Sequence, residues 1–315
     1  MATTTSITTT YAGQYAGQII GQSLLAGNTL ANGLITFKPN IIGSEVVRRL
    51  ETGTLIADGT CDFSDTSTVT STERILTPKE LQVNLELCKK DWLNDWSGVQ
   101  MGASAHRNMP SDVQSYIIQR ITAKVSAENE VKIWQGAAGA GSYDGFETLL
   151  AADAALPAAQ EVTGTTVTAA NVIDELGKVV DAIPSSLYGR DDLYIFVSQN
   201  IYRKYKRALG GFGTSGLGAA GYLDRGNNQD IPVEFFDGVK VAMVNGMSDD
   251  VMVAGTSDNF WFGTSILSDW NEVKLLDMAD LDGSQNFRYI QRFLAGVQYG
   301  VVEDIVTYGI VNAAN

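Results

Sequence analysis

The apolar positions between residues 110 and 136 recur with helical spacing. They form a stripe of Val113, Ile117, Ile121 and Val125, which Val131 and Trp134 continue after a slight rotation. Spacings of three and four residues are typical of an amphipathic helix with one buried face. The pattern predicts one long helix of roughly 36 Å at 1.5 Å per residue. We expect this helix to pack one face on a sheet and to meet another element near its ends.

Upstream of the helix, the pattern changes to a period of two. Leu81, Val83 and Leu85 alternate with polar residues, which indicates a half-buried strand within residues 75–88. Residues 53–63 are expected to form the opposite strand, joined to the first through the polar run SDTSTVTSTER. Residues 46–90 are therefore predicted to form a long hairpin, and residues 45–50 a short helical turn. An isolated hairpin is marginally stable in water, so this one should lean on another surface.

Downstream of the helix, strand and helix patterns alternate and then give way to strands alone. The compact unit of residues 145–258 has predicted helices at 168–184 and 199–209, strands at 191–198, 231–245 and 250–257, and a hairpin turn at Asp237-Gly238. After residue 259 the pattern favours strands at 271–281, 286–300 and 301–311. We expect these late strands to supply the sheet beneath the long helix, which gives an α+β chain.

Composition narrows the range of partners. The chain has 315 residues, 44% of them hydrophobic, and a net charge of −14. Tight binding of double-stranded nucleic acid needs clustered Lys and Arg, so a chain this acidic is expected to lie near nucleic acid without holding it. No apolar run reaches the roughly 20 residues of a membrane span. The Thr-rich start lacks the basic and apolar regions of a signal peptide, and we expect folding in a cytoplasm.

Candidate catalytic and cofactor residues are few. His106 is the one histidine, and the segment GASAHRNMP around it carries no nucleophile signature. Gly211, Gly213 and Gly216 match G-x-G-x-x-G, but a dinucleotide site needs a strand before the motif and a helix after it, and a flexible loop is favoured here. The segment DMADLDGS lacks the first oxygen ligand of a calcium loop and is expected to be a turn. No catalytic, cofactor or metal site is predicted.

Two other sets of residues are candidates for contacts. A basic cluster lies within residues 203–207 and consists of Arg203, Lys204, Lys206 and Arg207. Basic residues beside tyrosines can bind single strands, but in an acidic chain a face that pairs with an acidic neighbouring subunit is favoured. The two cysteines, Cys61 and Cys88, are expected on opposite arms of the hairpin. Two free thiols and one cross-strand disulfide are both open.

Residues 1–45 are low in charge and contain the duplication YAGQYAGQ. They have too little apolar surface for a core of their own and are expected to form an arm on another surface. Arm, hairpin and long helix each need a partner. These features point to assembly of many copies rather than to catalysis.

The order of elements resembles that of the major capsid proteins of tailed bacteriophages, the Hong Kong 97-type fold. The segments ILTPKELQVNLELCKKDW and RFLAGVQYGVVEDIVTYGIV are also similar to parts of such proteins. The resemblance assigns an N-terminal arm to residues 1–45, an E-loop hairpin to 46–90, a P-domain with the spine helix to 91–144, an A-domain to 145–258 and P-domain return strands to 259–315.

The resemblance implies a structural protein. Copies would form hexamers and pentamers of an icosahedral shell around packaged double-stranded DNA, assembled in a bacterial host cytoplasm and present in the virion. A portal and a separate scaffolding protein would be partners. Gly211, Gly213 and Gly216 would lie at the capsomer centre. Two alternatives remain: a shell protein of an encapsulin-type nanocompartment, and an α/β enzyme with an unrecognised site.

Overall fold

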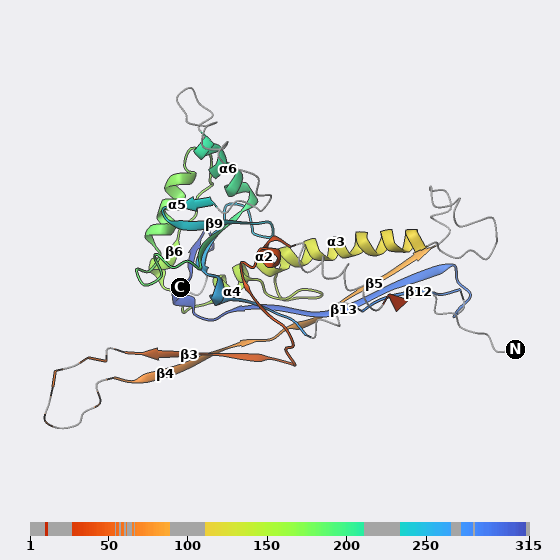
Figure 1. Ribbon diagram of the computed structural model, residues 1–315, viewed down its shortest axis with the longest axis horizontal. Helices are drawn as coiled ribbons and strands as arrows, with labels where there is room; N and C mark the ends of the chain where they lie inside the picture. The colour runs from red at the N-terminus through yellow and green to blue at the C-terminus, as the bar shows by residue number, and fades with distance from the viewer. Residues whose placement is uncertain are drawn as a thin grey trace.

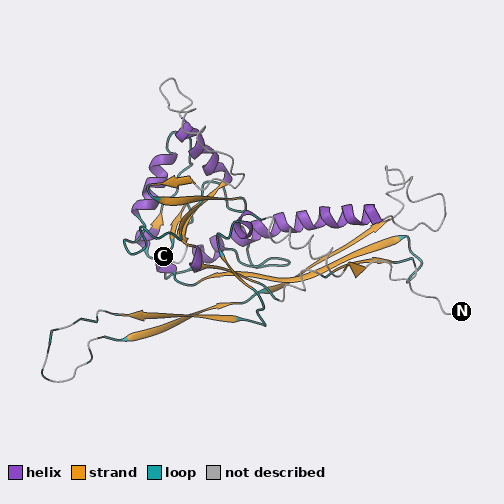
Figure 2. Ribbon diagram, in the orientation of Figure 1, coloured by secondary structure: helices purple, strands orange, loops and turns teal. Residues whose placement is uncertain are grey.

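The molecule consists of a long spine that carries an α/β unit at one end and a projecting hairpin below that unit (Figure 1). The computed structural model describes residues 10–11, 27–53, 55–56, 58–59, 61, 65, 67–88, 111–210, 234–265, 272–279 and 281–312. Figure 2 shows that the spine pairs one long helix with a strand layer, whereas the α/β unit mixes short helices and strands. Spine and α/β unit together are called the body below.

The spine sheet is built around β13 (Asn286–Tyr299), the longest strand. One edge of β13 pairs antiparallel with β5 (Lys79–Cys88), and the opposite edge pairs with β12 (Val273–Asp277). β11 (Phe260–Gly263) continues the pairing on the last residues of β13, and β2 (Thr36–Lys38) pairs with β11. The prediction that late strands supply the sheet of the long helix is confirmed for β12 and β13.

The long helix is α3 (Ser111–Gln135), close to the predicted 110–136. Its buried side chains include Ile117, Ile118, Val125, Ile133 and Trp134, which share one core with alternate residues of β13. The prediction was wrong for Val131, which is 45% exposed. At 100° per residue, Val131 has turned about 240° from Val125 and points away from the sheet.

The α/β unit has a six-stranded sheet in the order β6-β14-β10-β7-β9-β8. α5 (Val172–Asp181) and α6 (Gln199–Gly210) share a core with one face of this sheet. The hairpin between β8 and β9 turns at Asp237 and Gly238 as predicted, with φ of 47° and 79°. Positive φ at both positions is the geometry that a two-residue turn of matching twist requires. The strands are β6 (Glu161–Val162), β7 (Leu193–Ser198), β8 (Glu234–Phe236), β9 (Val239–Val244), β10 (Met252–Thr256) and β14 (Val306–Tyr308).

An aromatic cluster joins the α/β unit to the spine. The Trp134 ring lies 5.2 Å from the ring of Phe146, which begins α4 (Phe146–Ala152), and 5.3 Å from that of Phe196 in β7. Phe260 of β11 completes the cluster at 6.5 Å from Trp134. Burial of such rings contributes more than most core residues, because each removes a large apolar area from water. The helix therefore does meet a second element at its C-terminal end.

Two segments lie elsewhere than the sequence pattern predicted. The last strand, β14, does not return beneath the helix with the rest of residues 259–315; it lies between β6 and β10 in the α/β sheet. The second segment is the arm of residues 1–45, whose described parts lie on the chain's own body. β1 (Thr10–Tyr11) pairs with β12, α2 (Asn28–Ala31) leads into buried Leu34 and Ile35, and β2 pairs with β11. The sequence pattern did not show the two strand pairings, because the partners of β1 and β2 lie more than 200 residues away.

Candidate assembly surface

The projecting hairpin consists of β3 (Glu45–Thr52) and β4 (Val69–Leu76). Two predictions about it were wrong: residues 45–50 form a strand rather than a helical turn, and β5 is not the second arm, because it pairs with β13. The polar run expected at the tip supplies most of β4. Thr and Val have high strand propensity, so SDTSTVTSTER can form a strand although its pattern is polar.

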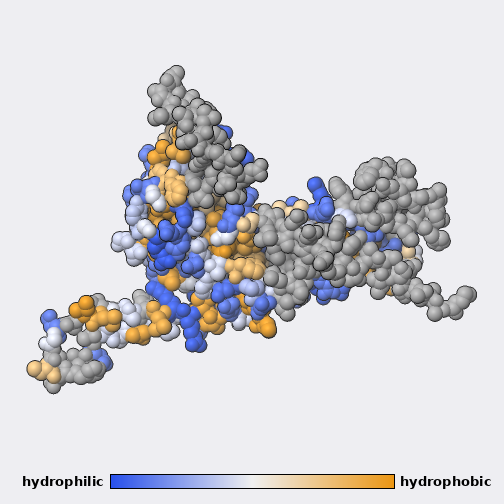
Figure 3. Space-filling model, viewed as in Figure 1, coloured by the Kyte–Doolittle hydropathy of each residue, from blue (hydrophilic) through white to orange (hydrophobic). Residues whose placement is uncertain are grey.

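The two faces of this hairpin differ in chemistry. Residues that pair directly across an antiparallel ladder share a face, so Val46 lies beside Ile75 and Val69 lies beside Thr52. On this outer face Val46, Leu50, Val69 and Ile75 are 44, 72, 60 and 51% exposed. Figure 3 shows apolar surface along the hairpin, separate from the main body of the molecule. Four large apolar side chains on one face of a two-stranded ribbon are typical of a surface that another molecule covers.

The inner face is held by two ion pairs, here called the latch. Arg49 Nη1 lies 2.5 Å from Glu303 Oε2, in η5 (Val302–Asp304). Arg74 Nη2 lies 2.5 Å from Asp153 Oδ2, just after α4, and its guanidinium stacks on the Tyr299 ring at 4.6 Å. At the root of the hairpin, Leu76 is fully buried. The sequence pattern did not point to these residues, because alternation identifies the two faces of a strand but not the partner of each face.

The two carboxylates of the latch, Asp153 and Glu303, have lowered pKa values, which keep them ionised. Burial alone would raise the pKa of Asp153, but hydrogen bonds from the Ala155 amide, Tyr299 and Arg74 outweigh it and lower that pKa. Burial would likewise raise the pKa of Glu303, and the bond from Arg49 reverses the effect. Both pairs are therefore charged throughout the neutral range.

A second polar junction lies where α2, the spine helix and the α/β unit meet. The carboxylate of Glu130, which is 4% exposed, accepts the Thr29 hydroxyl at 2.5 Å and the Thr29 amide at 3.2 Å. Trp134 Nε1 donates to the same hydroxyl at 2.9 Å. Burial raises the pKa of Glu130, although the bonds from Thr29 and the Gly246 amide oppose the shift. This junction ties the N-terminal part of the chain to α3.

The loop between β9 and β10 is attached to the same end of the spine. The Glu147 carboxylate accepts the Ser248 amide at 2.8 Å and its hydroxyl at 2.5 Å, and burial raises the pKa of Glu147. Gln135 Nε2 donates to the Gly246 carbonyl at 2.8 Å. A Cβ on Gly246 would lie 2.0 Å from the Glu130 carbonyl oxygen, so only glycine permits this approach. The polar contacts fix the α/β unit on the spine beside the aromatic cluster.

The structure divides the predicted basic cluster of α6. Lys204 is bonded within its own chain, to Asp250 at 3.5 Å and to the Val167 carbonyl at 2.6 Å. Lys206 lies over the Tyr202 ring at 4.7 Å. Arg203 and Arg207 are exposed. A role of this cluster between subunits stays a prediction, and Arg203 and Arg207 are the members that face outward.

The two cysteines do not face each other. Cys61 is exposed in the connection between β3 and β4, and Cys88 ends β5 opposite Asn286. Both are free thiols. The prediction that they lie on opposite arms of one hairpin is wrong, because the hairpin ends at Leu76 and Cys88 lies in β5, which pairs with β13. Of the two, Cys61 alone belongs to the projecting hairpin.

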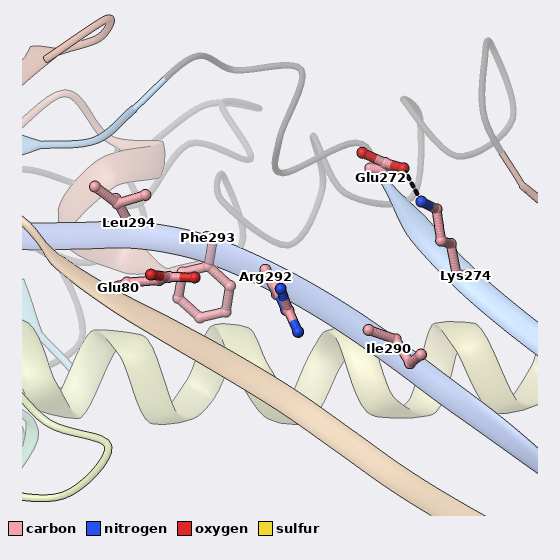
Figure 4. Close-up of a pocket in the computed structure, with 7 residues that line it drawn as sticks. All are labelled: Glu80, Glu272, Lys274, Ile290, Arg292, Phe293 and Leu294. Carbon is pink, nitrogen blue, oxygen red and sulfur yellow. Dashed lines mark ion pairs between the residues drawn. The ribbon is translucent and has the colours of Figure 1, made fainter. Parts of the chain in front are cut away.

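A shallow groove of about 450 Å³ lies on the spine sheet, where its lining residues come from β5, β12 and β13 and the segment just before β12 (Figure 4). Lys274 pairs with Glu272 at 2.5 Å, and Arg292 and Glu80 lie on the neighbouring strands. The groove brings together charges of both signs without a nucleophile beside a base. Across the described residues, no group of three or more His, Cys, Asp and Glu is placed to hold a metal ion. None of the helices in the described ranges is long and apolar enough to cross a membrane.

Four residues singled out in the sequence, His106, Gly211, Gly213 and Gly216, lie outside the described residues. The predictions about the glycine-rich loop therefore stay predictions.

Comparison with known proteins identifies the fold. No family model and no curated protein matches the chain. The capsid of the native GTA particle matches with a TM-score of 0.58 at 15% identity over 88% of each chain. A chain of Mycobacterium phage Adephagia matches with 0.57 at 14% identity, over 90% of this chain and 89% of that one. The capsid of Cyanophage P-SCSP1u matches with 0.55 at 10% identity, over 90% and 88%. The resemblance predicted from the sequence is confirmed at the level of the fold.

Proposed function

We propose that this chain is the major capsid protein of a tailed bacteriophage, whose copies form hexamers and pentamers of an icosahedral head around double-stranded DNA. The head would assemble in the bacterial cytoplasm and remain in the virion. The fold shared with phage and GTA capsids over nearly the whole chain supports this proposal. The net charge of −14 supports it too, because an acidic wall lets packaged DNA slide rather than adhere.

The single observation that carries the proposal is the uncovered outer face of the β3–β4 hairpin. This face leaves apolar side-chain area exposed to water, and that exposure does not stabilise a monomer. The side chains are those of Val46, Leu50, Val69 and Ile75. A two-stranded ribbon cannot bury both of its faces by itself. A neighbouring copy that covers the outer face would bury this area, so the hairpin acts as the contact between subunits.

The parts of the chain receive roles in this proposal. The hairpin of β3 and β4 is the E-loop, α3 with β5, β12 and β13 forms the P-domain, and the α/β unit including β14 is the A-domain. The segment of residues 211–233, which includes Gly211, Gly213 and Gly216, would lie at the capsomer centre. A portal and a separate scaffolding protein are further partners.

Replacing Leu50 or Ile75 by Asp tests the contact. A carboxylate on the outer face would have to lose its hydration when a neighbouring copy covers it, which costs several kcal/mol per contact. We expect Leu50→Asp and Ile75→Asp to abolish shells and capsomers in negative-stain images and in native mass spectra. The melting temperature of the subunit should stay within a few degrees of wild type, because both side chains are exposed in the monomer.

Leu281→Asp is the matched control, since Leu281 is 55% exposed but lies in the turn between β12 and β13. It should leave assembly intact. Wild-type protein that remains a monomer at high concentration contradicts the proposal. Shells that hold cargo protein in place of DNA would instead indicate a nanocompartment.

A further inference from the structure

The direction in which the hairpin leaves the body is not set by close packing. A cavity of about 280 Å³ separates its inner face from the body, lined among others by Arg49, Arg74, Gly300 and Glu303. Among the residues of β3 and β4 whose burial is described, only Leu76, at the root, is buried. Since a cavity leaves its lining atoms without contacts on one side, it resists tilting less than a packed interface would.

The two ion pairs of the latch bridge this gap at different distances from the root. Along the ladder, Arg74 lies opposite Val47, two residues from Leu76, whereas Arg49 lies opposite Thr72, four residues from Leu76. Because the two ion pairs hold the hairpin at different distances from its root, together they restrain its inclination relative to the body. Tyr299 strengthens the inner point, because its hydroxyl donates to Asp153 at 2.8 Å while its ring stacks on Arg74.

We propose that Arg49 and Arg74 are positioning residues, which hold the hairpin at one inclination through Glu303 and Asp153 and thereby set the angle at which copies of this chain meet. The proposal rests on the proposed shell function for its second half only. Inclination matters because the hairpin is a lever: a strand of eight residues spans about 26 Å, and a tilt of 10° at the root moves the far end by about 5 Å. An error of that size exceeds what a side-chain contact tolerates.

The effect of the latch can be measured in the unassembled full-length protein as the distance between the hairpin and the body. Cys61, exposed in the hairpin connection, and a second cysteine at Asp174→Cys on the outer side of α5 carry spin labels, in a Cys88→Ser background. Pulsed electron paramagnetic resonance then measures the distribution of distances between the two spin labels, one on the hairpin and one on the body. We expect Arg49→Ala/Arg74→Ala to broaden the distribution and shift its mean by roughly 5 Å or more.

Arg48→Ala is the matched control. Arg48 is the same residue type on the adjacent position of β3, but it lies on the outer face opposite Glu73 and is exposed. It should leave the distribution unchanged. A charge exchange, Arg49→Glu with Glu303→Arg, should restore a narrow distribution that Arg49→Glu alone loses. An unchanged distribution in the double alanine variant overturns the latch.

Particle size separates the latch from the shell function. If copies assemble, electron micrographs of the double alanine variant should show a wider spread of particle diameters than wild type and Arg48→Ala. Uniform particles of wild-type size, despite a broadened distance distribution, overturn the link between inclination and assembly. If wild-type protein forms no particles, the proposed function fails, while the distance measurement still decides whether Arg49 and Arg74 hold the hairpin.

Discussion

A carboxylate buried without a cation stands out at the scale of single residues. Glu130 is held by the amide and hydroxyl of Thr29 and by the Gly246 amide, and no Lys or Arg among the described residues forms an ion pair with it. Hydrogen bonds from several donors can stabilise a buried carboxylate, but they leave a cost of desolvation that only protonation removes. Glu130 therefore gives specificity to the junction of three segments and not maximal stability.

Removing the Glu130 carboxylate should destabilise the fold. Glu130→Ala leaves the donors of Thr29 and Gly246 without an acceptor, and the expected loss is about 2–4 kcal/mol in the free energy of unfolding, measured by urea titration. Glu130→Gln keeps the volume and one acceptor, so its loss should be smaller. Glu128→Gln, at an exposed position of the same helix, is the control and should change little. Equal stabilities for Glu130→Ala and wild type would contradict the role of this junction.

Glu130 should also make the stability of the fold depend on pH. Because burial raises the pKa of Glu130, the folded state binds a proton more readily than the unfolded chain does. Its contribution to stability is complete below the unfolded pKa of about 4.3 and is lost as pH rises through the raised folded pKa. The melting temperature of Glu130→Gln, relative to wild type, should therefore improve between pH 4 and pH 7. A constant difference across that range would show that Glu130 does not titrate there.

At the scale of elements, the contact between the β9–β10 loop and α3 can be tested by replacing glycine residues. Gly246→Ala places a Cβ 2.0 Å from the Glu130 carbonyl and forces the loop off the spine, which should cost about 2–3 kcal/mol. Gly177→Ala is the matched substitution inside α5, where a new Cβ meets nothing within 4 Å. It should stabilise the chain by up to about 1 kcal/mol, because alanine favours a helix. Thermal melts of both variants check the contrast, and two changes of the same sign would contradict it.

Elements whose pattern is strong were predictable, and their partners were not. The stripe of α3 and the alternation of β5 correctly predicted a helix and a strand, because the period shows which face of an element is buried. Pairing needs a second strand that the period does not name, so β5 was placed in the hairpin although its partner, β13, lies about 200 residues later. β14 was placed in the wrong sheet for the same reason.

Predictability was lower still for the functional contacts. Glu130 lies on the same helix face as Ile133 and Trp134. A charged residue on a face with buried apolar residues is a pattern from which a buried polar contact can be predicted. Arg49 and Arg74 gave no such signal, since basic residues in a polar strand are ordinarily solvated. Their partners Glu303 and Asp153 come from distant parts of the chain and became visible only once the fold placed them.

For the whole molecule, the net charge sets how copies approach one another. Copies that carry −14 each repel at low ionic strength, while the apolar face of the hairpin attracts at contact only. We expect assembly, followed by light scattering, to become faster and more complete as salt rises from about 0.05 to 0.5 M. A subunit with a net charge near zero would show no such gain, because it has no repulsion for salt to screen. Assembly that weakens steadily with salt would mean that ion pairs between copies outweigh the apolar contact.

The position of β14 makes the folding of the α/β unit depend on a strand that is synthesised after all the others of its sheet. Tyr308 is fully buried, and its hydroxyl bonds to Glu175 at 2.8 Å, so the strand between β6 and β10 is a structural member rather than a tail. Of the strands in that sheet, β14 is the last to leave the ribosome. A nascent chain thus carries its projecting hairpin from early in translation but completes its α/β unit only after β14 has emerged. A product truncated before β14 would expose the apolar hairpin face without a finished α/β unit behind it.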